Sequence, residues 1–162
     1  MAGVTGDEGS SLAFTSYTKF FNKTVTEEVF KQFIEEINPY FHDLNAEKIT
    51  DFYLKSVDKN NSDAIKQKIY DFYGDILIKC PTYLFTKGYA ERSLNETNVY
   101  FYEFNYTSID DKTGQQFGVY HGSELKFVFG LPLLEPKNST SEEVIEFTKD
   151  MIRWWTDFAK YG

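Results

Sequence analysis

One short segment limits the possible folds of this chain more than any other. Residues 98–106 read Asn-Val-Tyr-Phe-Tyr-Glu-Phe-Asn-Tyr, with aromatic residues on both alternating faces. Such a run is typical of a β-strand that is covered on both sides. A strand needs neighbours, because its backbone donors and acceptors otherwise lack partners. The sequence offers only one further strand, which ends near Thr5.

Helices account for most of the remaining pattern. The motif Thr24-x-x-Glu27 predicts a helix start, and Asn38-Pro39 predicts its end. Apolar residues repeat on one face of this helix: Val29, Phe30, Phe33, Ile34 and Ile37. A final helix is predicted after the motif Thr140-x-x-Glu143. Its predicted buried residues are Val144, Phe147, Met151, Trp155 and Phe158.

Two more helices are predicted between these. One spans about residues 46–56 and should bury Ile49, Phe52 and Tyr53. The other starts near residue 62, and Pro81 should kink or break it before a weaker helical pattern continues to about residue 92. The chain is thus helix-rich with few strands. Either the rest of its sheet lies outside these residues, or the chain is a compact α+β domain of two or three strands.

Charge excludes two classes of partner. Asp and Glu total 25 against 17 Lys and Arg, a net charge of -8, so nucleic acid and anionic membranes are poor partners. No apolar run is long enough for a membrane span, and residues 1–7 lack the features of a signal peptide. We therefore expect neither feature in these residues.

Glycosylation motifs indicate the compartment. Five Asn-x-Ser/Thr acceptors favour a secreted or extracellular glycoprotein, although unmodified surface loops are the alternative. The acceptors are Asn22, Asn60, Asn95, Asn105 and Asn138. Cys80 is the single cysteine, so it has either a partner in another chain or segment, or a free thiol.

Few residues are candidates for catalysis. Of the two histidines, His42 follows a predicted helix end and suits a partly buried loop, whereas His121 lies between Gly118 and Gly122 in a loop after the strand. Glu8 is the candidate acid, and its simpler interpretation is a residue beside a glycine turn. No Gly-x-Ser-x-Gly motif supplies a nucleophile. The histidine and cysteine spacing matches no metal site, and we expect no cofactor.

Four segments resemble the type-B carboxylesterase and cholinesterase family. They are residues 3–10, 73–81, 118–133 and 153–162, and the last two are the most specific. The resemblance implies that residues 1–162 are the C-terminal part of a single α/β-hydrolase domain whose N-terminal part is absent. The fold class is therefore α/β, as a partial hydrolase fold rich in helices. The remainder of the domain would be a partner.

The resemblance also assigns roles. Glu8 and His121 match the acid and the base of the family's serine triad, in which histidine takes the serine proton and the carboxylate orients the histidine. The family's serine and oxyanion hole lie upstream of the matching part. Cys80 matches a cysteine whose disulfide partner this chain lacks. Ser123 stands where cholinesterases carry an aromatic residue that helps hold choline, so choline specificity is doubtful.

These observations favour a fragment of a secreted serine esterase that acts on small carboxylic esters and is inactive alone. A non-catalytic adhesion protein of the neuroligin type is the main alternative. The intact segment Asp7-Glu8-Gly9-Ser10 favours the enzyme, because adhesion does not need a triad acid. A stand-alone helical interaction module is a third possibility.

Overall fold

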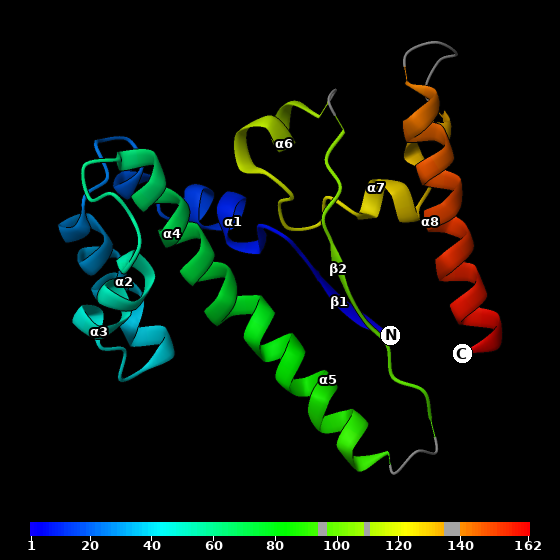
Figure 1. Ribbon diagram of the computed structural model, residues 1–162, viewed down its shortest axis with the longest axis horizontal. Helices are drawn as coiled ribbons and strands as arrows, with labels where there is room; N and C mark the ends of the chain where they lie inside the picture. Colours follow the sequence, from blue (N-terminus) through cyan, green and yellow to red (C-terminus); the bar gives the residue numbers. More distant parts are fainter. Residues whose placement is uncertain (94–96, 109–110, 135–139) are drawn as a thin grey trace. The chain divides into compact units, whose positions relative to one another are not determined.

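The computed structural model describes residues 1–93, 97–108, 111–134 and 140–162 (Figure 1). The chain forms two compact units. The helical unit is Asp7–Pro81, and the sheet unit combines Met1–Gly6 with Thr82–Gly162. In the described part of the chain, no helix combines the length and the apolar character required to span a membrane.

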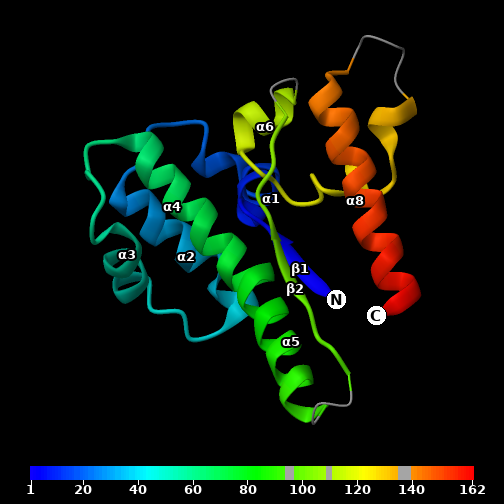
Figure 2. The same ribbon diagram turned by 45° about the vertical axis from the view of Figure 1, so that its right-hand side comes forward.

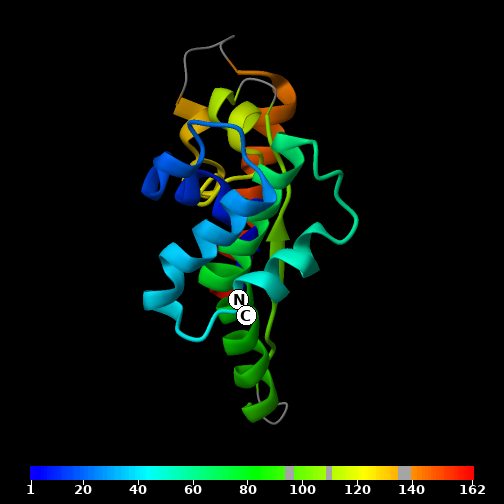
Figure 3. The same cartoon turned by 90° about the vertical axis from the view of Figure 1, so that its left-hand side faces the viewer.

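The helical unit packs its elements around an aromatic and aliphatic core, and its helices run from blue to green in Figure 3. The elements are α1 (Glu8–Ser16), the 3-10 helix η1 (Thr18–Phe20), α2 (Glu27–Phe41), α3 (Ala46–Leu54), α4 (Ser62–Gly74) and the π-helix η2 (Asp75–Lys79). The whole predicted apolar face of α2 is buried, with Phe30, Phe33, Ile34 and Ile37 fully inaccessible. Helix α1 was not predicted, since its sequence has no clear apolar stripe.

The ends of α2 differ from the prediction. Thr26 caps the helix, two residues later than the predicted Thr24, and its hydroxyl accepts from the Val29 N–H. The helix also continues through Pro39 to Phe41. A proline in the last turn removes only one hydrogen bond, so the helix tolerates it there. His42 follows as an exposed C-cap residue with a φ of 56°, rather than the partly buried residue predicted.

Two further predictions in the helical unit need correction. Phe52 is 75% exposed, because α3 turns Thr50 and Leu54 toward the core instead. Pro81 does not break the helix: helical residues precede it and follow it, and the π-helical η2 lies just upstream. A π-helical turn interrupts the regular ladder of α-helical hydrogen bonds, which accommodates a proline that has no N–H.

The sheet unit contains two adjacent parallel strands, β1 and β2, which run side by side in Figures 1 and 2. The elements are β1 (Ala2–Thr5), β2 (Phe101–Phe104), α6 (Lys112–Phe117), α7 (Leu125–Val128), the 3-10 helix η3 (Leu131–Leu134) and α8 (Glu142–Tyr161), with α5 (Cys80–Arg92) from its third residue onward. Ala2 pairs with Phe101 and Thr5 with Phe104. Both predicted strands are therefore confirmed, and they pair with each other.

Helix α8 builds the core of the sheet unit. It buries Val144 and Met151 against Phe104 and Phe127. Ser141 caps it, one residue after the predicted Thr140. The prediction that β2 is covered on both faces holds only in part among the described residues: Phe104 is 5% exposed, but Phe101 is 41% exposed.

Candidate active site

Glu8 is a buried residue at the start of the helical unit. It is the first residue of α1 and only 3% exposed. The strand β1 ends three residues before it, so Glu8 follows a strand and a short turn and begins a helix. Asp7 and Ser10 close this turn, since the Ser10 hydroxyl donates to the Asp7 carbonyl at 2.8 Å.

Two glycines bring α1 against α4. A Cβ atom on Gly9 would lie 2.0 Å from the Tyr70 carbonyl oxygen and 2.3 Å from the Gly74 nitrogen. A Cβ atom on Gly74 would lie 2.6 Å from the Gly9 nitrogen and 3.3 Å from the Glu8 Cβ. The two helix backbones therefore meet directly beside Glu8, and neither position has space for a side chain.

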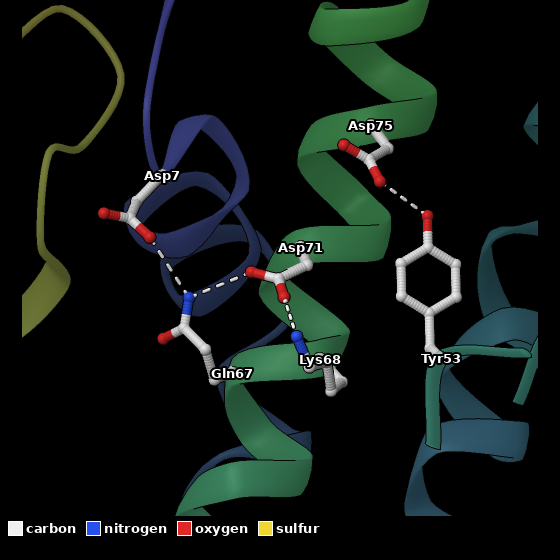
Figure 4. Close-up of polar contacts among 6 residues, drawn as sticks. All are labelled: Asp7, Tyr53, Gln67, Lys68, Asp71 and Asp75. Carbon is white, nitrogen blue, oxygen red and sulfur yellow. Dashed lines mark hydrogen bonds and ion pairs between the residues drawn. The ribbon is translucent and has the colours of Figure 1, made fainter. Parts of the chain in front are cut away.

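A polar tether adds to this contact (Figure 4). The side-chain nitrogen of Gln67 donates to Asp7 Oδ1 at 3.2 Å and to Asp71 Oδ1 at 3.0 Å. Lys68 Nζ lies 2.7 Å from Asp71 Oδ2. The residue immediately before Glu8 is thus linked to α4, which fixes the backbone of the turn from a second side.

The π-helix η2, which directly follows α4, is joined to α3 by a side-chain hydrogen bond. Tyr53 on α3 donates its hydroxyl proton to Asp75 Oδ2 at 2.7 Å (Figure 4). Burial raises the pKa of Tyr53 well above its ordinary value, and the carboxylate of Asp75 raises it further. Tyr53 therefore stays protonated and keeps donating to Asp75 throughout the physiological pH range.

His121 belongs to the sheet unit. It is exposed and lies in a turn between α6 and α7. Gly118 and Gly122 take φ values of 67° and 79°, which side chains disfavour. The predicted glycine-bracketed loop is confirmed. Ser123 follows with its hydroxyl buried and without a hydrogen-bond partner among the described residues.

Sequence reasoning missed Asp111, which shapes this turn. Asp111 caps α6 by accepting from the Gly114 N–H at 2.9 Å, and its carboxylate pairs with Lys126. Burial opposes ionisation of Asp111, but Lys126 and the backbone donors outweigh it and lower its pKa below the ordinary value. Aspartate is a favoured N-cap residue, and this preference could have drawn attention to Asp111.

Other candidate positions have simpler surroundings. Asn22, Asn60 and Asn105 are exposed, whereas Asn95 and Asn138 fall outside the described residues. Cys80 is exposed with a free thiol. Across residues 1–93, 97–108, 111–134 and 140–162, no three His, Cys, Asp or Glu side chains converge as metal ligands would.

Along the chain, Glu8 follows β1, and the turn with His121 follows β2, the parallel neighbour of β1. The chain belongs to the carboxylesterase family, whose model matches residues 1–162. Members of this family have the α/β-hydrolase fold, and the helix-rich structure with a small parallel sheet is consistent with a part of it.

Cholinesterases are among the similar proteins. The chain is 33% identical to the cholinesterase of Mus musculus, 31% identical to acetylcholinesterase-1 of Trittame loki and 29% identical to the acetylcholinesterase of Bungarus fasciatus. These matches cover 98–100% of this chain but only 27–29% of each relative. The chain therefore spans less than a third of the length of these relatives and is consistent with a C-terminal portion.

Proposed function

We propose that this chain supplies the acid and the base of a serine carboxylic-ester hydrolase, with Glu8 as the acid and His121 as the base. The observation that carries the proposal is topological. Glu8 follows β1, and His121 follows the neighbouring parallel strand β2. Parallel strands end at the same edge of a sheet, where α/β enzymes present their catalytic side chains.

The roles follow from general chemistry. The imidazole of His121 takes the proton of a serine and returns it to the leaving alcohol, while the Glu8 carboxylate orients the imidazole and stabilises its protonated form. Neither group attacks an ester by itself. The nucleophile and the oxyanion donors would come from sequence that corresponds to the larger, unmatched part of the relatives.

The proposal extends to substrate and compartment. Ser123 in place of an aromatic residue favours a general carboxylic ester over a choline ester, because a hydroxyl cannot provide a cation-π contact. Exposed acceptors at Asn22, Asn60 and Asn105 support a secreted or extracellular glycoprotein. The three relatives are named as cholinesterases, so the comparisons do not favour the adhesion alternative.

A chimera tests the proposal. This chain replaces the matching 27% of the mouse cholinesterase, and hydrolysis of a neutral butyrate ester is measured on the secreted product. We expect His121→Gln and Glu8→Gln each to lower kcat by roughly 10³- to 10⁶-fold, since the serine loses its base or the base loses its orientation. Circular dichroism of each secreted variant checks that it is folded, since a fluorophosphonate would label only a serine whose base is intact.

His42→Gln is the matched control, because His42 is exposed at a helix end of the helical unit. It should leave kcat within a few-fold of the parent. A chimera that is secreted but inactive, or a His121→Gln variant with unchanged turnover, would overturn the proposal. A choline ester should react no faster than the neutral ester with the same acyl group.

A further inference from the structure

The carboxylate of Asp111 contacts groups on both sides of the turn that carries His121. Besides accepting from the Gly114 N–H, Asp111 lies near the Tyr120 phenol, whose pKa is raised by burial and by the charge of Asp111. Its ion pair with Lys126 completes the set, and the Asp111 side chain is only 9% exposed. A helix cap needs only the first of these contacts, so the carboxylate has more partners than capping requires.

The additional partners lie on either side of His121. Tyr120 precedes it directly, and Lys126 follows it by five residues. The two glycines of the turn, Gly118 and Gly122, give the backbone freedom that must be lost on folding. Fixing both flanks of the turn to one carboxylate is an effective way to restrict that freedom.

The far end of the turn is anchored in the core. Phe127, next to Lys126, is 1% exposed, and its ring lies 5.8 Å from that of Phe104 and 5.1 Å from that of Phe147. Lys126 Nζ also lies 5.0 Å from the centre of the Phe127 ring. Asp111 therefore connects the turn to a rigid aromatic cluster.

We propose that Asp111 is a positioning residue for His121, acting through its contacts with Tyr120 and Lys126. This inference rests on the proposed function, in which His121 is the base. Misplacing a catalytic group by about 1 Å can cost roughly 10²-fold in rate. Loss of the Asp111 charge should therefore lower kcat by about 10- to 100-fold.

The first test observes His121 in this chain without any catalysis. The chain has only two histidines, so the imidazole C–H signals in an NMR spectrum can be assigned with a His42→Gln variant. We expect Asp111→Asn and Lys126→Met to broaden or split the His121 signals, and Lys126→Arg to preserve them. The His42 signals should not change, because His42 belongs to the other unit.

The matched control is an ion pair of the same unit that does not touch the turn. Asp150 Oδ1 lies 2.8 Å from Arg153 on α8, and both side chains are well exposed. Asp150→Asn removes a charge of the same sign and should leave the His121 signals unchanged. This comparison distinguishes the effect of the Asp111 contacts from a general effect of net charge.

The second test is kinetic and uses the chimera. Asp111→Asn and Lys126→Met should lower kcat by about 10- to 100-fold while KM stays within a few-fold, because the base is misplaced but ester binding is not. Lys126→Arg should retain most of kcat. Circular dichroism checks folding, and if Asp111→Asn fails to fold, Lys126→Met decides the outcome.

The outcomes of the two inferences can be distinguished. Unchanged kcat, or unchanged His121 signals, in variants of Asp111 and Lys126 would overturn the positioning role if His121→Gln still abolishes turnover. If His121→Gln leaves turnover intact, the proposed function fails, and the positioning role for catalysis fails with it. The NMR comparison then still reports whether Asp111 orders the turn.

Discussion

The direct contact between α1 and α4 makes a sharp prediction for Gly9→Ala. The new methyl group would lie 2.0 Å from the Tyr70 carbonyl oxygen and 2.3 Å from the Gly74 nitrogen. Both are backbone atoms, so neither can rotate away. An ordinary contact is at least 3.4 Å, and the helices must therefore separate by about 1.4 Å.

The expected cost follows from two opposing effects. Overpacking of a well-packed core costs about 1–3 kcal/mol, and the rigid backbone on both sides places this case at the upper end. Alanine in a helix gains up to about 1 kcal/mol over glycine. We therefore expect Gly9→Ala to lower the free energy of unfolding of the helical unit by about 2 kcal/mol, which is roughly 8–16 °C in Tm for a unit of this size.

Gly88→Ala is the matched control. Gly88 lies within α5, and a Cβ atom there would meet nothing within 4 Å. This variant should be as stable as the parent or up to about 1 kcal/mol more stable. Thermal and urea unfolding followed by far-ultraviolet circular dichroism measures both. If Gly9→Ala matches Gly88→Ala in stability, the reasoning about the helix contact is wrong.

The remaining predictions concern single groups. Because the pKa of Asp111 is lowered in the folded chain, its carboxylate stabilises the fold above the ordinary carboxyl pKa, and this contribution is lost as the pH falls through the folded pKa. Asp111→Asn should therefore lower the free energy of unfolding by about 1–3 kcal/mol at neutral pH. In urea titrations this difference from the parent should shrink below pH ~4. Tyr53→Phe should cost about 1–3 kcal/mol by removing the hydrogen bond to Asp75, measured by thermal unfolding with the exposed Tyr40→Phe as a control. Cys80 should react with a thiol dye or form a dimer on a non-reducing gel, since the chain has no second cysteine. The chain alone should gain no mass with a fluorophosphonate, and a stoichiometric adduct would reveal a nucleophile that the proposal does not contain.

The sequence predicted buried residues correctly where large apolar residues repeat regularly on one face of a helix. The face of α2 was predicted in full because five large apolar residues leave one way to bury them. Phe52 was misplaced because α3 is short and carries apolar residues on more than one side, so that tertiary packing decides which side is buried. Helix ends were shifted by one or two residues where neighbouring threonines and serines compete as caps.

The candidate site was only partly visible in the sequence. The glycines around His121 predicted its turn, since positive φ values favour glycine. Asp111 and Lys126 are far apart in sequence for an ion pair, and no local pattern brings them together. The approach of Gly9 to Gly74 was equally hidden, because close backbone contact leaves no apolar signal to read.

The same glycine contact has a consequence for the order of folding. Ala2 pairs with Phe101, so forming the sheet closes a loop of about a hundred residues. Gly9 meets Gly74, which brings the two ends of the helical unit together. Once that unit has formed, the effective loop shrinks to about 30 residues, and its closure entropy falls by about 1 kcal/mol.

Formation of the helical unit therefore lowers the entropy cost of pairing β1 with β2. We expect Gly9→Ala to slow the pairing of β1 with β2, although Gly9 belongs to the other unit. Both tryptophans of the chain lie on α8 in the sheet unit, so their fluorescence during refolding reports on that unit. Gly9→Ala, a substitution in the helical unit, would then slow the change in tryptophan fluorescence that reports folding of the sheet unit.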